Sequence, residues 1–295
     1  MVCIVGGMIT IKAKNYSDQW ENITFGSMTF NGGEEHIKLD AFWRFRKEIV
    51  ITAKLRSSKE IIQLAMITDA LRNQGAKNIF LNLPYVPYGR QDRVCNWGEA
   101  FSLRVFCDLL NSLNFDRVTI VDPHSDVTPA LIRNCEVVKM LTIVDKFLAP
   151  MPMTPDTKLC PTETLPVSPD AGANKKVFEI SQYCQKPMIR ADKLRDVSNG
   201  EIKETIVFAD NLNGQAVTIY DDICDGGRTF IELAKVLKAK GAKTVVLFVT
   251  HGIFSKGVQC LFDAGIDHIY TTDSLALPTT FHNDKVTILK LEYIL

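Results

Sequence analysis

The sequence lacks an excess of charge of either sign, since its 295 residues include 34 Lys and Arg and 34 Asp and Glu. No general attraction to nucleic acid or to an anionic membrane follows, so any phosphate site must be local. The eight cysteines contain no Cys-x-x-Cys or Cys-x-x-His pattern, which argues against a zinc site. We therefore expect neither a nucleic-acid partner nor a membrane partner.

A secretory leader and a long apolar run are also missing. Residues 1–11 are apolar, but they have no basic start and are too short to cross a bilayer. A cytoplasmic protein with reduced cysteines is thus expected, and Cys107 is read as a small buried apolar side chain. Residues 1–11 are predicted to form the first β-strand.

What the sequence does contain is typical of a globular protein, with 46% hydrophobic and 23% charged residues. Apolar, β-branched runs alternate with segments of helical period. Strands are predicted at residues 48–52, 78–84, 117–122, 165–168, 216–220, 244–250, 268–271 and 286–290, and helices at residues 59–73, 101–112 and 229–240. This alternation predicts an α/β fold with mostly parallel sheets.

A short internal repeat supports two similar domains. Residues 71–77 and 237–243 both read as a helix end, a glycine turn and the approach to an apolar strand. Duplication of one α/β unit explains the match, and convergent turn chemistry is the alternative. The proline-rich residues 150–166 are the predicted boundary. We expect domains at 1–150 and 151–295, with the last strands either in the second domain or returning to the first.

The strongest chemical signal lies at residues 217–230, where a strand that ends in two acids leads into a glycine-rich loop and a helix. Ligands of α/β proteins bind at this edge of the sheet. Gly226 and Gly227 would let backbone N–H groups approach a phosphate at the helix N-terminus. Asp221 and Asp222 could accept hydrogen bonds from sugar hydroxyls or hold the water shell of a metal ion. The structural alternative is a strand, a tight turn and a helix cap.

This segment resembles the ribose-phosphate-binding loop of the phosphoribosyltransferase superfamily. Further segments are similar to motifs of one family in it, the ribose-phosphate pyrophosphokinases, and they occur in that family's order. They are LPYVPYGRQDR at 83–93, VDPH at 121–124, VSPDAG at 167–172, KLRD at 193–196 and THGIFS at 250–255. The resemblance implies two similar phosphoribosyltransferase-like domains, each a mostly parallel β-sheet flanked by helices.

The resemblance implies an ATP site in the first domain. Arg90, Gln91 and Asp92 follow an apolar run, and a guanidinium suits a triphosphate because it can bind bidentately. His124 is implied as a magnesium ligand near ATP. Imidazole is a weak ligand for magnesium, so contact through water or phosphate stays open. A surface loop and a structural histidine are the alternatives for these positions.

The resemblance also implies a sugar-phosphate site and a catalytic lid in the second domain. The sugar-phosphate residues are Asp221, Asp222, Asp225, Gly226, Gly227, Arg228 and Thr229. Asp170 is implied as a ligand of Mg²⁺, which a hard carboxylate suits. Lys193 and Arg195 lie in the polar stretch 190–203, where two cations could close over the transferring phosphoryl group. An exposed hairpin turn at residues 199–200 is the structural reading, and both can hold together.

Residues 30–34 resemble the family's adenine loop, which reaches into a neighbouring subunit's site. This implies Phe30 and Glu34 at ATP, and a homodimer or larger homo-oligomer with ATP at the subunit interface. Gly32 stands where the family has Asp, so that Asp's adenine contact does not carry over. After His124 the family's glutamine-bearing segment is absent, and regulation tied to it does not carry over either.

The sugar-phosphate loop departs from the family pattern Asp-Thr-Gly-Gly-Thr. Residues 225–229 read Asp-Gly-Gly-Arg-Thr, so one hydroxyl is lost and Arg228 enters where a small residue is usual. Arg228 could point outward and pair with an acid. It could instead face the phosphate pocket and suit a second phosphoryl group, as in ADP-ribose.

The implied activity is transfer of diphosphate from ATP, with Mg²⁺, to the anomeric hydroxyl of ribose 5-phosphate, giving 5-phosphoribosyl 1-diphosphate and AMP. ADP-ribose is an alternative acceptor. A non-catalytic regulatory homologue is a second reading, but the chain keeps His124, Asp170, Lys193 and Arg195. A phosphoribosyltransferase that consumes the activated sugar is a third, but it would not need the loop at residues 90–92.

Overall fold

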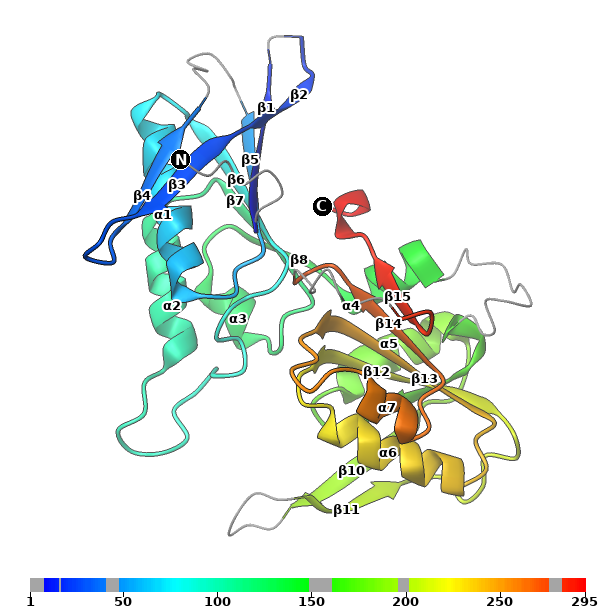
Figure 1. Ribbon diagram of the computed structural model, residues 1–295. Helices are drawn as coiled ribbons and strands as arrows, with labels where there is room; N and C mark the ends of the chain where they lie inside the picture. Colours follow the sequence, from blue (N-terminus) through cyan, green and yellow to red (C-terminus); the bar gives the residue numbers. More distant parts are fainter. Residues whose placement is uncertain (1–7, 16, 41–47, 149–160, 196–201, 276–282) are drawn as a thin grey trace. The chain divides into compact units, whose positions relative to one another are not determined.

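The computed structural model describes residues 8–15, 17–40, 48–148, 161–195, 202–275 and 283–295. The chain divides into two compact units between Val138 and Lys139 (Figure 1). No helix in these ranges has the length and apolar content needed to cross a bilayer.

Unit 1 is built on a six-stranded sheet in the order β2-β1-β5-β6-β7-β8. The last four of these strands run parallel, and β1 and β2 add an antiparallel edge. A separate hairpin pairs β3 with β4. The elements are β1 (Ile9–Lys14), β2 (Trp20–Ile23), β3 (Phe25–Thr29), β4 (Glu35–Leu39), β5 (Glu48–Ala53), α1 (Ser58–Asn73), β6 (Asn78–Leu83), α2 (Ser102–Ser112), β7 (Arg117–Val121), α3 (Val127–Leu131) and β8 (Cys135–Val138).

Unit 2 is built on a seven-stranded sheet in the order β11-β10-β9-β12-β13-β14-β15. All pairs are parallel except β10 with β11, and the last strands β14 and β15 lie in this sheet. The elements are α4 (Met140–Ile143), η1 (Val144–Leu148), η2 (Pro161–Glu163), β9 (Leu165–Ser168), α5 (Asn174–Cys184), β10 (Ile189–Arg195), β11 (Ile202–Val207), β12 (Ala216–Cys224), α6 (Arg228–Ala239), β13 (Thr244–Gly252), α7 (Gln259–Asp263), β14 (His268–Thr272), β15 (Val286–Leu289) and η3 (Leu291–Tyr293).

Each unit has its own apolar core between sheet and helices. In α1, one stripe at helical spacing is buried, namely Leu64, Ile67, Thr68 and Leu71. In unit 2, β13 is buried along almost its whole length, as expected for a central parallel strand covered on both faces. The predicted α/β fold with mostly parallel sheets flanked by helices is confirmed.

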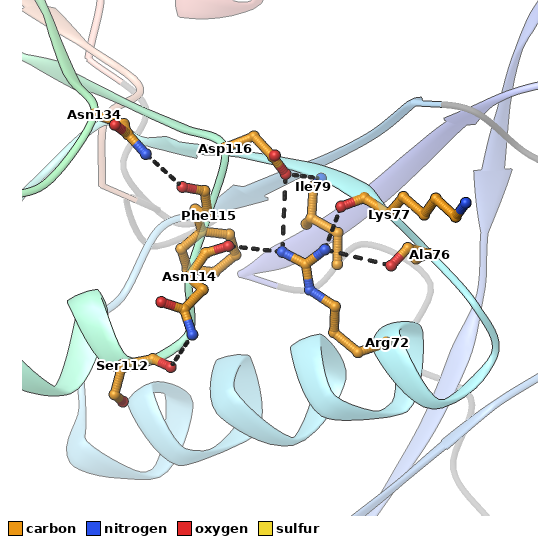
Figure 2. A network of polar contacts seen from close by, with 9 residues as sticks. All are labelled: Arg72, Ala76, Lys77, Ile79, Ser112, Asn114, Phe115, Asp116 and Asn134. Atoms are coloured by element: carbon orange, nitrogen blue, oxygen red, sulfur yellow. Dashed lines mark hydrogen bonds and ion pairs between the residues drawn. The ribbon is translucent and has the colours of Figure 1, made fainter.

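The internal repeat extends into matching side-chain contacts. At the end of α1, Arg72 contacts Asp116 at 3.8 Å, and Asp116 Oδ2 accepts the N–H of Ile79 at 2.7 Å (Figure 2). The same Arg72 guanidinium donates to the carbonyl oxygens of Lys77 and Asn114. We call this set the unit 1 clamp.

Unit 2 has the same arrangement at the end of α6. Lys238 Nζ lies 2.7 Å from Asp267 Oδ2, which also accepts the N–H of Val245 at 2.8 Å. Lys238 also donates to the carbonyl of Lys243 at 3.0 Å. In this unit 2 clamp, the cation, the carbonyl and the strand N–H each follow their unit 1 counterpart by the same number of positions. Duplication of one α/β unit would produce such matching contacts.

Some expectations fall on residues outside the described ranges. Residues 1–7 of the predicted first strand lie there, and β1 begins at Ile9. Most of the predicted boundary at 150–166 lies there as well. The turn at residues 199–200 is also undescribed, but β10 and β11 on either side form an antiparallel pair.

Candidate functional site

The acid-rich segment forms the carboxyl end of β12 and the start of α6. The strand runs to Cys224, and Gly227 caps the helix with φ 75° and accepts the N–H groups of Phe230 and Ile231. A β-carbon at Gly227 would lie 3.0 Å from Leu261 Cδ2. The positive φ and this close approach both require glycine here. Asp225, Gly226 and Thr229 are half-buried around this turn.

Two adjacent carboxylates lie within β12. Asp222 is 6% exposed, and its Oδ1 accepts the N–H of Ile223. Burial raises the pKa of Asp221 well above its usual range, and the charges of Asp222 and Asp170 raise it further. The charges of these three carboxylates therefore influence one another at this end of the sheet.

Asp170 and Lys193 contact each other directly. Lys193 Nζ donates to Asp170 Oδ2 at 2.7 Å, and the Lys193 side chain is only 8% exposed. Asp170 Oδ1 also accepts the N–H of Ala173, and its backbone carbonyl accepts the Ser168 hydroxyl. The carboxylate is thus fixed at the end of β9, opposite a cation of β10.

The strand order explains why residues far apart in sequence meet here. β10, β9 and β12 are neighbours and parallel, so their carboxyl ends lie at one edge of the sheet. The pairing of β10 with β11 shifts between Leu194 and Arg195, and such bulges often adjust side chains beside active sites. Arg195 ends β10, while its side chain and Asp196 lie outside the described residues.

The loop after β13 packs on the acid-rich turn. The N–H groups of Ile253 and Phe254 donate to Cys224 O, and that of Ser255 donates to Asp225 O. His251, in β13, is 2% exposed and its Nδ1 lies 2.8 Å from Ser274 Oγ. The motif at residues 250–255 therefore stabilises the acid-rich turn through backbone hydrogen bonds.

Arg228 is exposed and lines a groove between α6 and β11. The groove has a volume of about 660 Å³ and starts at the residue after Gly227. Its lining residues are Glu204, Thr205, Ile206, Val207, Arg228, Glu232, Val236 and Lys240. Arg228 thus lines one groove with Glu204 and Glu232, as in the outward reading, and it directly follows Gly227 of the glycine-rich turn.

In unit 1 the loops after β6 and β7 meet. A β-carbon at Gly89 would lie 3.9 Å from His124 Cβ, so the loop that carries Arg90 adjoins His124. Two non-glycine residues at this meeting point have left-handed backbones, Tyr88 with φ 62° and Asp122 with φ 40°. Strained backbone of this kind concentrates at functional sites.

The side chains of the first loop differ in exposure. Arg90 and Gln91 are exposed, whereas the Asp92 carboxylate is 18% exposed and lies 3.8 Å from Arg93 Nε. The Gln91 backbone closes a turn, donating to Tyr88 O. Arg90, Gln91 and His124 are thus all exposed at this edge of the unit 1 sheet.

The predicted adenine loop is the tip of the β3–β4 hairpin. Phe30 is 49% exposed and Glu34 is exposed. The hairpin is anchored on α1 by Glu35, which accepts from Gln63 at 2.8 Å and contacts Lys59 Nζ at 3.1 Å. Phe30 and Glu34 therefore lie on a different element from the loops that carry Arg90 and His124.

The residues present fit a magnesium ion that arrives with a nucleotide. Within the described ranges, no group of three or more His, Cys, Asp or Glu side chains is arranged to hold a metal ion. Mg²⁺ keeps several waters and is usually held by one or two carboxylates together with substrate phosphates. Asp170, fixed by backbone contacts and only 37% exposed, is a suitable carboxylate.

Sequence reasoning missed Lys176, whose Nζ lies 3.9 Å from Asp222 Oδ2. It lies on α5, and no local pattern links it to a strand end forty-six positions away. It also missed Glu35, which anchors the predicted adenine loop. The adjacent Glu34 and Glu35 look alike in sequence, and only the fold shows which one is held by α1.

Family models match two parts of the chain. Residues 19–113 match the N-terminal domain of ribose phosphate pyrophosphokinase, and residues 179–293 match the phosphoribosyl synthetase-associated domain. The two matches fall largely within units 1 and 2, respectively.

Proteins of similar sequence are ribose-phosphate pyrophosphokinases. A ribose-phosphate pyrophosphokinase of Bradyrhizobium diazoefficiens is 30% identical over 234 residues, covering 78% of this chain and 70% of the relative. One of Corynebacterium efficiens is 30% identical over 258 residues, covering 85% and 76%. The crystal structure of phosphoribosylpyrophosphate synthetase from Mycobacterium smegmatis superposes with a TM-score of 0.78 at 22% identity, covering 92% of this chain and 87% of that one.

Proposed function

The chain belongs to the ribose-phosphate pyrophosphokinase family, and we propose that it transfers the β,γ-diphosphate of ATP to the anomeric hydroxyl of ribose 5-phosphate. The sugar oxygen bonds to the β-phosphorus and its hydroxyl proton is released to solvent. The bond from that phosphorus to the α,β-bridging oxygen breaks, and AMP leaves with the bonding electron pair. The products are 5-phosphoribosyl 1-diphosphate and AMP.

Such a step depends mainly on positioning and on neutralising phosphate charge. Lys193 and Arg195 are assigned to the transferring group, where cations stabilise charge that develops in the transition state. The Lys193–Asp170 contact at 2.7 Å is the observation that carries this assignment, because it places a largely buried cation beside the acid-rich strand end. On binding, Lys193 would exchange the Asp170 carboxylate for phosphoryl oxygens.

The two substrates are assigned to residues of different units. ATP is assigned to Phe30, Glu34, Arg90, Gln91, Asp92 and His124, and the sugar phosphate to Asp221, Asp222, Asp225, Gly226, Gly227, Arg228 and Thr229. Asp221 and Asp222 would accept hydrogen bonds from the sugar hydroxyls. The backbone N–H groups at the start of α6 would bind the phosphate.

Each unit is assigned its own candidate magnesium ligand: His124 near ATP in unit 1, and Asp170, for a second Mg²⁺, in unit 2. Bound magnesium supplies positive charge to the triphosphate, and a carboxylate is its preferred protein ligand. His124 would act through a water molecule or through phosphate, because imidazole is a weak magnesium ligand.

The test is product identification. Purified protein is mixed with ATP, Mg²⁺ and ribose 5-phosphate, and the products are identified by mass. The expected pair is AMP and 5-phosphoribosyl 1-diphosphate. Formation of ADP, or no reaction beside a family enzyme assayed in parallel, would refute the proposal. Conversion of supplied 5-phosphoribosyl 1-diphosphate and a base to a nucleotide would support the transferase reading instead.

A second candidate is the same chemistry on a larger acceptor such as ADP-ribose. The observation in its favour is the groove of about 660 Å³ that begins at Arg228, next to the phosphate loop. An acceptor that continues beyond its first phosphate could extend into this groove, where Arg228 would meet a second phosphoryl group.

The ratio of kcat/KM values for ADP-ribose and ribose 5-phosphate tests this candidate. A charged contact is worth roughly 1.5–3 kcal/mol, so Arg228→Gly should move the preference toward ribose 5-phosphate by about tenfold or more. Lys235→Gly, farther along α6, serves as a control. An unchanged ratio in Arg228→Gly would leave ribose 5-phosphate as the acceptor and Arg228 as a surface residue.

A further inference from the structure

The side chain of Lys256 passes over the sugar-phosphate loop. Its Cε and Cδ atoms lie 3.8 and 3.9 Å from the position that a β-carbon would take at Gly226. The residue is exposed, and it has no hydrogen bond or ion pair with any residue in the described part of the chain. Among the described residues this lysine therefore has no acidic partner, and its side chain lies next to the loop at the N-terminus of α6.

The turn that carries Lys256 is fixed against this loop. Two N–H groups donate to Cys224 O at 2.8 and 3.1 Å, and a third donates to Asp225 O at 3.2 Å. Phe254 is buried, with a left-handed backbone at φ 46°, and Gly257 closes the turn by donating to Phe254 O at 2.8 Å. A turn held at this many points presents Lys256 in a defined place, which lowers the entropy lost when it binds a ligand.

The phosphate loop itself is short of positive side chains. Gly226 offers no side chain, and the cation in the loop sequence, Arg228, lines the groove toward β11. Backbone N–H groups and a helix N-terminus bind phosphate, but a cation adds a charge-assisted contact of roughly twice the strength of a neutral one. Lys256 approaches from the neighbouring loop, on the side that the missing Gly226 side chain leaves open.

We propose that Lys256 is a specificity-determining residue that binds the 5-phosphate of the acceptor together with the Gly226–Gly227 backbone. This inference rests on the proposed function, because it takes the loop as the acceptor's phosphate site. A residue that contacts the 5-phosphate is separated from the anomeric carbon by the sugar itself, so Lys256 would act on acceptor binding and not on ATP binding.

The experiment compares Lys256→Met and Lys256→Arg with Lys243→Met, a control that removes an exposed lysine at the opposite end of β13. Lys256→Met should raise the KM for ribose 5-phosphate by about tenfold or more, the effect of losing a charged hydrogen bond. The KM for ATP should stay within about twofold, since a binding residue specific to one substrate leaves the other unchanged. Lys256→Arg should recover most of the loss, and Lys243→Met should match the parent.

Binding of inorganic phosphate, measured by calorimetry, separates this inference from the proposed function. If the parent binds phosphate more tightly than Lys256→Met but makes no 5-phosphoribosyl 1-diphosphate, the proposed function fails, and Lys256 is a phosphate-binding residue of a different activity. If the parent is active and Lys256→Met keeps both its KM and its phosphate affinity, the function stands and the inference is overturned. If phosphate affinity falls in Arg228→Met but not in Lys256→Met, the inference is overturned and Arg228 is the phosphate-binding residue.

Discussion

At the scale of single residues, Lys193 and Asp170 form a direct ion pair. The 2.7 Å contact leaves the cation only 8% exposed, so phosphoryl oxygens would have to replace a carboxylate that is already in place. Such an exchange favours ligands that bring their own divalent cation, because Asp170 then gains a new partner as Lys193 leaves it.

We predict that the cations of β10 contribute more to turnover than to binding of ATP. Lys193→Ala and Arg195→Ala should each lower kcat by about two or more orders of magnitude, as expected when transition-state charge loses a stabilising partner. The affinity for ATP should change far less. Steady-state kinetics and calorimetry with ATP measure the two effects, with Lys243→Ala as the control. Near-normal turnover in both variants would contradict the assignment of these residues.

Gly32 allows a test of the adenine loop. Its φ is outside the left-handed region, and a β-carbon there would be 2.5 Å from the end of the exposed Glu34 side chain, which can move. We predict that Gly32→Asp, which restores the family's residue, lowers the KM for ATP by about two- to tenfold, the value of one hydrogen bond.

The neighbouring glycine provides the matched control for this substitution. Gly33 has φ 93°, a conformation that L-residues adopt only with strain, so Gly33→Asp should add the same charge without the benefit. An unchanged KM for ATP in Gly32→Asp would show that the β3–β4 hairpin does not contact adenine.

At the scale of elements, we expect the two clamps to contribute similarly to the free energy of unfolding. Asp116 and Asp267 each accept a strand N–H and contact a cation, and both are exposed by more than a third. Exposed ion pairs contribute little. Asp116→Ala and Asp267→Ala should therefore each lower the free energy of unfolding by about 1–2 kcal/mol, mainly by leaving a strand N–H without its acceptor.

Denaturant unfolding followed by circular dichroism measures these changes. Lys238→Met removes only the cation and should cost less than about 1 kcal/mol, as exposed pairs do. Asp267→Asn keeps a carbonyl oxygen for Val245 and should also cost less than Asp267→Ala. If Lys238→Met and Asp267→Ala were equally costly, the ion pair rather than the strand contact would be the source of the stability.

The long, periodic elements were predictable from sequence, and the irregular ones were not. The strand predicted at 165–168 matches β9, and helices α1, α2 and α6 match within a residue at each end. β12 was predicted to stop at Tyr220, but it continues through Cys224 because its acids remain paired with β13. The five-residue helices α3 and α7 are too short to show a period.

The candidate site was also predictable only in part. The motifs indicated which strand ends carry the acids and cations, since parallel strands place their carboxyl ends at one edge. The contact of Lys193 with Asp170 depends on β10 lying beside β9, an order that local sequence does not encode. Lys176 reaches the site from a helix without a motif, and Lys256 directly follows the motif at residues 250–255, which does not include it.

At the scale of the whole molecule, we predict an obligate homodimer or larger homo-oligomer. The predicted adenine residues Phe30 and Glu34 lie at an exposed hairpin tip anchored on α1, whereas Arg90 and His124 lie at the strand ends. A tip of this kind could complete the ATP site of a neighbouring copy. Sedimentation at the assay concentration should show no active monomer, and one that sediments alone with full activity would contradict the prediction.

The paired clamps have a consequence for how the protein can change. The contacts of each clamp join a helix end to strands of the same unit. Substitutions in one unit therefore leave the clamp of the other unit unchanged. Divergence can then be modular: the acceptor loop can lose a hydroxyl at Gly226 and gain Arg228 while the fastening of the half that carries Arg90 and His124 is untouched. Because each unit has its own clamp, a new specificity can evolve in one unit at a time.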